Sequence, residues 1–355
     1  MTTKIKTKPK RTTQPSPCTQ LVRRDALSQH PADDLRGLTT ETRNVAAVEL
    51  DRKSALEIGR IINDEDKRAA FAVEHALPQI AQAIEAAAAA IRAGGRLIYV
   101  GAGTSGRIAA LDASECPPTF GVPRTTVQYC MAGGAAALSH AAEFNEDSRR
   151  DGERDIARLR PGKKDVVVGI AASGRTPYTI AAVELAHKRG ARTVAVTCNR
   201  NSPLERAAEI GIVAEVGPEV VTGSTRMKAG TAQKLVLNMI STGAMVRLGY
   251  VYGNLMVNVS PTNEKLRERA LGVIAEITGV GRDEAAYALA AADNSVPVAV
   301  IMLKTGVSKP EAQRAFQSSN RNLRAAIAKT EQLRRQVRNG RNDTPRLARR
   351  KAAPR

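Results

Sequence analysis

The chain has 355 residues, enough for one large hydrophobic core or two smaller ones. Aromatic residues make up 3% of it and Trp is absent, which argues against binding nucleic acid by base stacking. No apolar run is long enough to cross a bilayer. The four Cys have no C-x-x-C spacing, which argues against a zinc site and a disulfide framework.

Most of the net charge of +19 lies at the two ends. Residues 1–37 hold eight Lys/Arg against three Asp, and residues 329–355 hold ten Lys/Arg against one Glu and one Asp. We predict that both segments are disordered basic tails, since blocks of like charge rarely pack. Weak contact with nucleic acid is the alternative use. The polar start lacks the apolar stretch of a secretory signal, so we expect a cytoplasmic protein.

Ordered structure is expected from Leu38 onward. Residues 55–95 read as two helices that end at Gly94–Gly95, a common helix stop. Strands and helices then alternate, which indicates an α/β protein with a parallel sheet between two helix layers. The run 136–159 reads as one long helix. The expected strands are 96–100, 126–133, 165–171, 192–198 and 210–216.

The pattern changes after Leu266 to short helical units separated by Gly, Asp, Asn or Ser. We therefore predict a main domain at 38–268 and a small helical module at 269–328. A helix-turn-helix DNA reader is the alternative for this module. Its Ala-rich candidate face offers few side chains for base edges, which favours a packing or dimerisation role.

Three polar turns carry the candidate binding residues. The first two follow the strands at 96–100 and 165–171, where open α/β sheets bind ligands. Helix N-terminal N–H groups and hydroxyls suit a phosphate dianion, although such residues also cap helices without binding anything. Their repetition favours a phosphate or sugar phosphate. The candidates are Gly103, Thr104 and Ser105; Ser173, Gly174, Arg175 and Thr176; and Ser224 and Thr225.

Familiar nucleotide patterns fit poorly. The string GAGTSG lacks the Lys-Ser/Thr pair of a P-loop. It fits G-x-G-x-x-G, but no acidic residue ends the next strand to hold a ribose, so dinucleotide binding is the weaker alternative. Arg175, Arg226 and Lys228 are candidate charge partners for a phosphate or carboxylate.

Glu115 is the first candidate acid. It is expected at the end of the helix after the first turn, just before Pro117–Pro118. The negative end of a helix dipole favours a neutral carboxyl, which a general acid needs. Glu143, Glu146 and Asp147 would share one helix face further on, and spacing alone does not choose among them. The four His have no ligand spacing, so no metal is expected.

Four long motifs resemble one known family, the N-acetylmuramic acid 6-phosphate etherases of the sugar isomerase (SIS) fold group. The resemblance runs from about residue 38 to residue 278. It implies a SIS-type three-layer αβα fold and a homodimer. The motifs are RLIYVGAGTSGRIAALDASECPPTFG, VVVGIAASGRTPYTIAA, EVVTGSTRMKAGTAQKLVLNM and YGNLMVNVSPTNEKLRERA.

The resemblance also implies a reaction without a cofactor. The family cleaves the D-lactyl ether of N-acetylmuramate 6-phosphate by elimination followed by water addition, as part of cell-wall amino sugar recycling. Its proton donor falls on Glu115 and its second catalytic glutamate on Glu146, which we assign as the base that removes the C2 proton. Its phosphate-binding hydroxyls fall on the first two turns. Ala171 departs from the wider SIS group, where many members carry Ser.

Two other functions stay open at this point. Related SIS proteins include a regulator that binds sugar phosphates without turnover, and aldose–ketose isomerases that share proton abstraction at C2. The presence of both glutamates favours the etherase.

Overall fold

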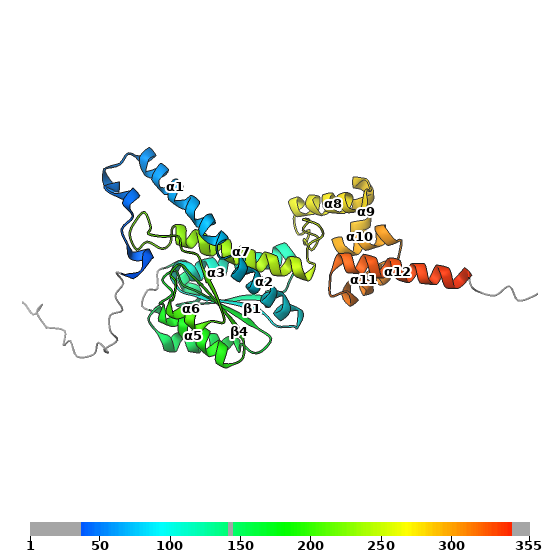
Figure 1. The fold of residues 1–355 in the computed structure, drawn as a ribbon. Helices are drawn as coiled ribbons and strands as arrows, with labels where there is room; N and C mark the ends of the chain where they lie inside the picture. Colours follow the sequence, from blue (N-terminus) through cyan, green and yellow to red (C-terminus); the bar gives the residue numbers. More distant parts are fainter. Residues whose placement is uncertain (1–36, 141–144, 343–355) are drawn as a thin grey trace, which may run out of the picture. The chain divides into compact units, whose positions relative to one another are not determined.

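The computed structural model describes residues 37–140 and 145–342, with side chains up to residue 336 (Figure 1). The expected tail at 1–37 lies outside these residues except for Gly37, and so does the end of the second tail from 343 on. Among the described helices, none alone is long and apolar enough to cross a membrane. Arg282–Ala291 and Val296–Thr305 meet the length and composition criteria only as a pair bent by 112°.

A parallel sheet forms the centre of the main domain, as the sequence predicts. In the described part of the chain it has five strands in the order β2-β1-β3-β4-β5. Chain order reverses at β1, which pairs with β2 on one side and β3 on the other. The carboxyl ends of β1 and β3 therefore meet at a switch point, the usual ligand site of such sheets. The strands are β1 (Leu97–Gly101), β2 (Val127–Met131), β3 (Val166–Ile170), β4 (Arg192–Thr197) and β5 (Ile210–Val213).

Helices cover both faces of the sheet, because alternate strand residues point to opposite sides. Tyr99 and Val168 belong to one buried cluster with α2, α3 and α7, and Ile98 and Val167 to another with α4 and α5. Figure 1 shows the two helix layers, which confirm the predicted three-layer α/β class. The helices are α1 (Ala55–Glu74), α2 (Leu77–Arg92), α3 (Gly103–Phe120), α4 (Arg149–Leu159), α5 (Pro177–Lys188), α6 (Pro203–Ala207) and α7 (Lys228–Leu248), with short 3-10 helices η2 (Thr39–Glu41), η3 (Val45–Ala47), η4 (Leu50–Arg52) and η5 (Gly134–Leu138).

Helix α3 is longer than the sequence suggested. It continues through Pro117 and Pro118 to Phe120, so the prediction that Glu115 stands at its end is wrong. The prolines remove two N–H donors near the end of the helix but do not end it. Gly121, with φ +64°, ends the helix, and its N–H donates to the carbonyl of Pro117. The dipole argument for a neutral Glu115 is weaker as a result.

The prediction of one long helix at 136–159 is also wrong. The described part of this run holds the short η5, a turn and then α4. Ser148 starts α4, because its hydroxyl accepts a hydrogen bond of 3.1 Å from the N–H of Asp151. Helical periodicity in the sequence did not reveal this capping serine, which ends the preceding irregular segment.

The C-terminal helices have a hydrophobic cluster of their own, which includes Val257 and Val259. The boundary expected between residues 268 and 269 falls inside α8, which begins at Glu264. Asn263 starts this helix by accepting a hydrogen bond of 2.8 Å from the N–H of Leu266. The helices are α8 (Glu264–Thr278), α9 (Arg282–Ala291), α10 (Val296–Thr305), α11 (Lys309–Ser318) and α12 (Leu323–Asn342).

The last helix, α12, corrects the expected tail at 329–355. It stays helical to Asn342, so disorder does not begin at residue 329. The density of Lys and Arg hid a helical apolar pattern, in which Ala326, Ile327 and Thr330 are buried. Arg, Gln and Leu are also good helix formers, so basic composition alone does not exclude a helix.

Three cysteines of the described chain, Cys116, Cys130 and Cys198, are buried free thiols. Burial raises their pKa to about 12, 11 and 12 respectively. They are therefore protonated at neutral pH and act as small core residues.

Candidate active site

The first turn joins β1 to α3 and depends on glycine. A Cβ on Gly101 would lie 2.9 Å from the backbone N of Gly106, where the chain turns back on itself. Gly103 has φ +52°, the left-handed region that disfavours side chains. The first N–H groups of α3 include those of Thr104 and Ser105. No helical turn precedes them, so they lack carbonyl acceptors within the helix. This helix start is therefore suited to an anion.

The second turn joins β3 to α5 beside the first. Gly174 has φ +68°, and a Cβ there would lie 2.3 Å from the hydroxyl oxygen of Ser202. The hydroxyl oxygen of the half-buried Ser173 accepts a hydrogen bond of 3.2 Å from the N–H of Arg175. Arg175 and Thr176 are also half-buried. Since β1 and β3 pair directly, this turn and the first one flank the same edge of the sheet.

The third turn, before α7, lies against the first. A Cβ on Gly230 would be 3.6 Å from Cγ2 of Thr104 and 3.7 Å from the carbonyl oxygen of Thr225. A glycine here lets the start of α7 pack closely on the start of α3. Ser224 and Thr225 are half-buried. The structure thus brings the first and third turns together, as their shared polar character suggested.

Glu146 contacts both of the first two turns, one through its side chain and the other through its backbone. A Cβ on Gly103 would lie 2.7 Å from Oε1 of Glu146, which places this carboxylate against the start of α3. The backbone carbonyl of Glu146 accepts a hydrogen bond of 3.0 Å from the N–H of Tyr178, in the first turn of α5. The residue is in a turn and not on a helix, and Glu143 lies outside the described residues.

Glu115 lies far from this point. It is exposed and stands twelve residues after Gly103, about 18 Å along α3 at the rise of an α-helix. Even if its side chain leans back toward the helix start, the Glu115 carboxyl stays about 13 Å along the helix from Gly103. The described chain therefore does not bring Glu115 and Glu146 together.

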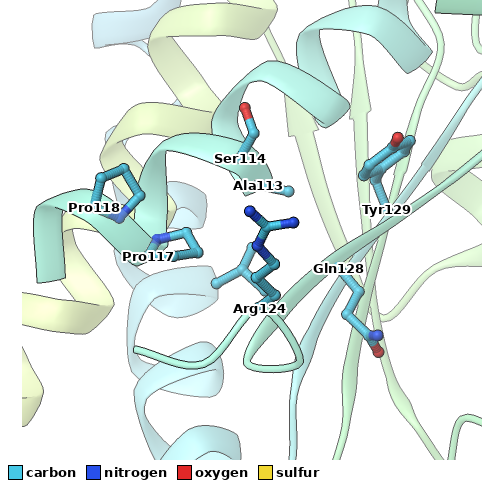
Figure 2. Close-up of a pocket in the computed structure, with 8 residues that line it drawn as sticks. Ala113, Ser114, Pro117, Pro118, Arg124, Gln128 and Tyr129 are labelled. Atoms are coloured by element: carbon cyan, nitrogen blue, oxygen red, sulfur yellow. The ribbon is translucent and has the colours of Figure 1, made fainter. Parts of the chain in front are cut away.

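A surface hollow of about 580 Å³ lies beside Glu115, between the second half of α3 and the edge strand β2. Figure 2 shows the guanidinium group of Arg124 pointing toward Ser114 in this hollow. The other lining residues are Ala113, Pro117, Pro118, Val127, Gln128 and Tyr129.

Lys228 was a candidate partner for substrate, and the structure corrects that prediction. It is fully buried, and its ammonium group bonds the carboxylate of Glu65 on α1. Burial raises the pKa of Glu65, but hydrogen bonds from Lys228 and Asn44 outweigh it, so the pKa is lowered. Arg226 is exposed.

Glu219 holds the start of α7. Its two carboxylate oxygens accept hydrogen bonds of 3.2 and 2.9 Å from the N–H groups of Lys228 and Ala229. Burial raises the pKa of Glu219, although the two N–H donors oppose this. Sequence reasoning missed both residues. Glu65 meets Lys228 only through the fold, and Glu219 binds backbone N–H groups, which residue type does not reveal.

A buried network ties the middle of α3 to the sheet and to α7. The carboxylate of Asp112 accepts hydrogen bonds from Tyr99 (2.7 Å), Asn238 (2.7 Å) and Ser241 (3.1 Å). Burial raises the pKa of Asp112, and its three donors limit the rise. This network fixes the middle of α3 against β1 and α7.

A second polar contact between α3 and α7 lies at the first turn. The hydroxyl of Ser105 donates a hydrogen bond of 2.9 Å to Oε1 of Gln233, and both residues are buried. Gln233 was also missed from the sequence. Its neighbours Thr231 and Lys234 are also polar, so the residue pattern did not single it out.

The described residues contain no group of three or more His, Cys, Asp or Glu placed to hold a metal ion. The site is instead a set of N–H groups, hydroxyls and one carboxylate at a sheet edge. Such a set can hold a phosphorylated ligand and exchange a proton with it.

Two family models match this part of the chain. The SIS domain matches residues 134–242, and the glucokinase regulatory protein N-terminal SIS domain matches residues 79–187. The fold and its polar turns are thus those of a SIS-domain protein. A phosphoheptose isomerase structure from Francisella tularensis is 19% identical, with a TM-score of 0.45, over 55% of this chain and 100% of that one.

Sequence relatives define the family. An N-acetylmuramic acid 6-phosphate etherase from Aeromonas hydrophila is 53% identical over 287 residues, which are 81% of this chain and 96% of that protein. One from Symbiobacterium thermophilum is 57% identical over 275 residues, 77% of this chain and 91% of that protein. The chain belongs to the N-acetylmuramic acid 6-phosphate etherase family.

Proposed function

We propose that this chain is a carbon–oxygen lyase that cleaves the ether between D-lactate and C3 of N-acetylmuramate 6-phosphate. The products are N-acetylglucosamine 6-phosphate and D-lactate, as in cell-wall amino sugar recycling. One observation carries the proposal beyond family membership: the Glu146 carboxylate lies against Gly103, beside the second polar turn. A base at that point can act on a sugar whose phosphate is bound by the turns.

The phosphate binds at the helix starts. N–H groups of α3 and the hydroxyls of Thr104 and Ser105 face it from the first turn, and Ser173 and Thr176 from the second. Ser224 and Thr225 approach from the third turn through the contact at Gly230. All of these groups donate hydrogen bonds, which a phosphate dianion accepts.

Glu146 and Glu115 divide the chemistry. Glu146 takes the C2 proton of the open-chain sugar, whose aldehyde makes that proton acidic. The electron pair forms the C2=C3 double bond and expels the lactyl oxygen, which Glu115 protonates. Water then adds its oxygen at C3 and a proton at C2. The route needs no metal or redox cofactor, because the aldehyde itself stabilises the developing charge.

The active unit is a homodimer in which Glu115 comes from a second copy. Acid and base act on neighbouring carbons, each within about 3 Å of its atom, so their carboxyls can be at most about 9 Å apart. Within one chain, the Glu115 carboxyl lies about 13 Å along α3 from Gly103, the residue that Glu146 lies against. Leu111, one turn before Glu115, is 50% exposed and gives this end of α3 an apolar surface for a partner.

A non-catalytic regulator of sugar phosphates is the second candidate, favoured by the match to the glucokinase regulatory protein SIS domain. An isomerase would share the step at C2 but release nothing. Incubation with N-acetylmuramate 6-phosphate, followed by measurement of D-lactate, separates the three. We expect D-lactate in amounts equal to the sugar consumed. Tight binding without D-lactate would establish the regulator, and exchange of the C2 proton with solvent without D-lactate release would favour the isomerase.

Two expectations stay predictions. A cytoplasmic location suits a phosphorylated substrate, and fractionation of cells would test it.

The second is contact of the basic termini with nucleic acid, which concerns residues mostly outside the described ones. Binding of DNA by the full chain and by a chain lacking residues 1–36 and 343–355 would test that contact.

A further inference from the structure

Gln233 presents a buried amide to the first turn. It is 1% exposed, and its Oε1 accepts the hydrogen bond from the Ser105 hydroxyl. Its Nε2 is also buried and has no hydrogen-bond partner among the described residues. A buried N–H group without a partner is rare in proteins, whereas an under-used carbonyl oxygen is more common. With Oε1 toward Ser105, the amide leaves its buried N–H donor unused.

The surroundings hold Gln233 firmly in place. Gly230, one helical turn earlier, packs against Thr104 of the first turn. Glu219 accepts hydrogen bonds from the N–H groups at the start of α7, and Lys228 pairs with Glu65 there. The Gln233 side chain thus has little freedom except rotation of its terminal amide, whose oxygen and nitrogen are nearly identical in size.

A bound phosphate would change which orientation is preferred. A phosphate dianion only accepts hydrogen bonds, so the Ser105 hydroxyl must give its hydrogen to the phosphate. It then no longer donates to Gln233. If the amide turns over, Nε2 donates to the oxygen of Ser105, and the hydroxyl keeps a partner on both sides.

We propose that Gln233 is a positioning residue, whose amide donates to the Ser105 hydroxyl and thereby directs the hydroxyl hydrogen to the substrate phosphate. The inference rests on the proposed function, because it takes the first turn as the phosphate site. Gln233 does not touch substrate and acts through Ser105. A purely structural role, joining α7 to α3, is the competing explanation.

Gln233→Met tests this role, since methionine has a similar size and no donor. The KM for N-acetylmuramate 6-phosphate should rise roughly tenfold, the loss of one hydrogen bond to a charged group, with kcat within about twofold. The dissociation constant of inorganic phosphate, measured by calorimetry, should rise by the same factor. Unchanged KM and phosphate affinity would overturn the proposal.

The double variant asks whether Gln233 acts through Ser105. Ser105→Ala should raise KM at least as much as Gln233→Met, and adding Gln233→Met to it should cause no further rise. Factors that multiply in the double variant, or no effect of Ser105→Ala, would contradict the proposal.

Ser241→Ala is the matched control. It removes another buried hydrogen bond between α7 and α3, at Asp112, and should lower the melting temperature without changing KM. An equal rise in KM in this control would favour the structural explanation. Failure of the proposed function is distinguishable, because the unchanged chain would then release no D-lactate, while calorimetry with phosphate would still test Gln233.

Discussion

The two ends of helix α3 differ in how completely one chain surrounds them. The first end is covered by Glu146, by Gly230 and by the buried amide of Gln233. The other end presents an exposed Glu115, a half-exposed Leu111 and an open hollow. The motif that contains the first turn and Glu115 is continuous in sequence. Its two ends nevertheless lie at separate places in one copy of the chain. The first end carries the proposed phosphate site, and the second is exposed in a single copy.

Glu146→Gln should cause the largest loss at the first end. Without its base, the enzyme should lose both D-lactate release and exchange of the C2 proton with solvent, each by roughly two to four orders of magnitude. Deuterium incorporation at C2, followed by NMR, measures the exchange. Exchange at the unchanged rate would exclude Glu146 as the base.

Glu115→Gln should separate the two steps. D-lactate release should fall by roughly two to four orders of magnitude, because the leaving oxygen lacks its proton donor. Exchange at C2 should continue, since Glu146 is intact. An equal fall of both rates would mean that the two glutamates do not divide the reaction as proposed.

A mixture of these two inactive variants tests whether the ends of α3 meet across copies. In a symmetric dimer, each mixed pair has one site with both glutamates and one with neither, so equal mixing should restore roughly a quarter of the activity. The activity should appear only after subunits exchange. A mixture that stays inactive after verified exchange would place both glutamates in one chain's site.

Glu65→Gln should weaken the support of the first end. It leaves the fully buried Lys228 charge without its partner, which should lower the free energy of unfolding by about 3–5 kcal/mol at pH 7. Arg68→Gln is the control, because Arg68 meets the same carboxylate from the surface and should cost less than about 1 kcal/mol. Denaturant titrations of both variants measure the difference.

The same pair predicts a pH dependence. The pKa of Glu65 is lowered from its usual 4.5 in the folded state, so its contribution is present above that value and is lost as the pH falls through the folded pKa. The stability gap between the unchanged chain and Glu65→Gln should therefore narrow below pH 4.5. A constant gap down to acid pH would show that Glu65 ionisation is not coupled to folding.

Ser173→Ala should have the smallest effect. It removes one hydroxyl from the second turn, so KM should rise roughly fivefold with kcat unchanged. Steady-state kinetics beside Ser105→Ala would show which turn contributes more to phosphate binding. A fall in kcat without a rise in KM would place Ser173 in the chemical step.

The fold was largely predictable from local pattern. Apolar runs such as 165–171 identify buried strands, and glycine-rich turns after them identify the edge that binds ligands. The errors concerned the residues at which helices begin and end. Pro117–Pro118 suggested a helix stop, yet Gly121 is where the left-handed backbone ends α3. Ser148 was read as part of a helix that it in fact begins.

The site was predictable only where its residues are close in the sequence. The three turns carry visible Gly, Ser and Thr signals. Glu146 reaches Gly103 through an irregular segment, and Gln233 reaches Ser105 through the packing of α7 on α3. These contacts depend on tertiary geometry, so residue type and spacing did not reveal them.

The buried thiols of the protein offer a practical way to test the proposed dimer. Cys116, Cys130 and Cys198 are protonated and enclosed, so they should not react with maleimides at neutral pH. With Cys18 replaced by Ser, a cysteine introduced by Ser114→Cys would then be the single reactive thiol. A spin label there would report the distance between the far ends of α3 in two copies directly in solution.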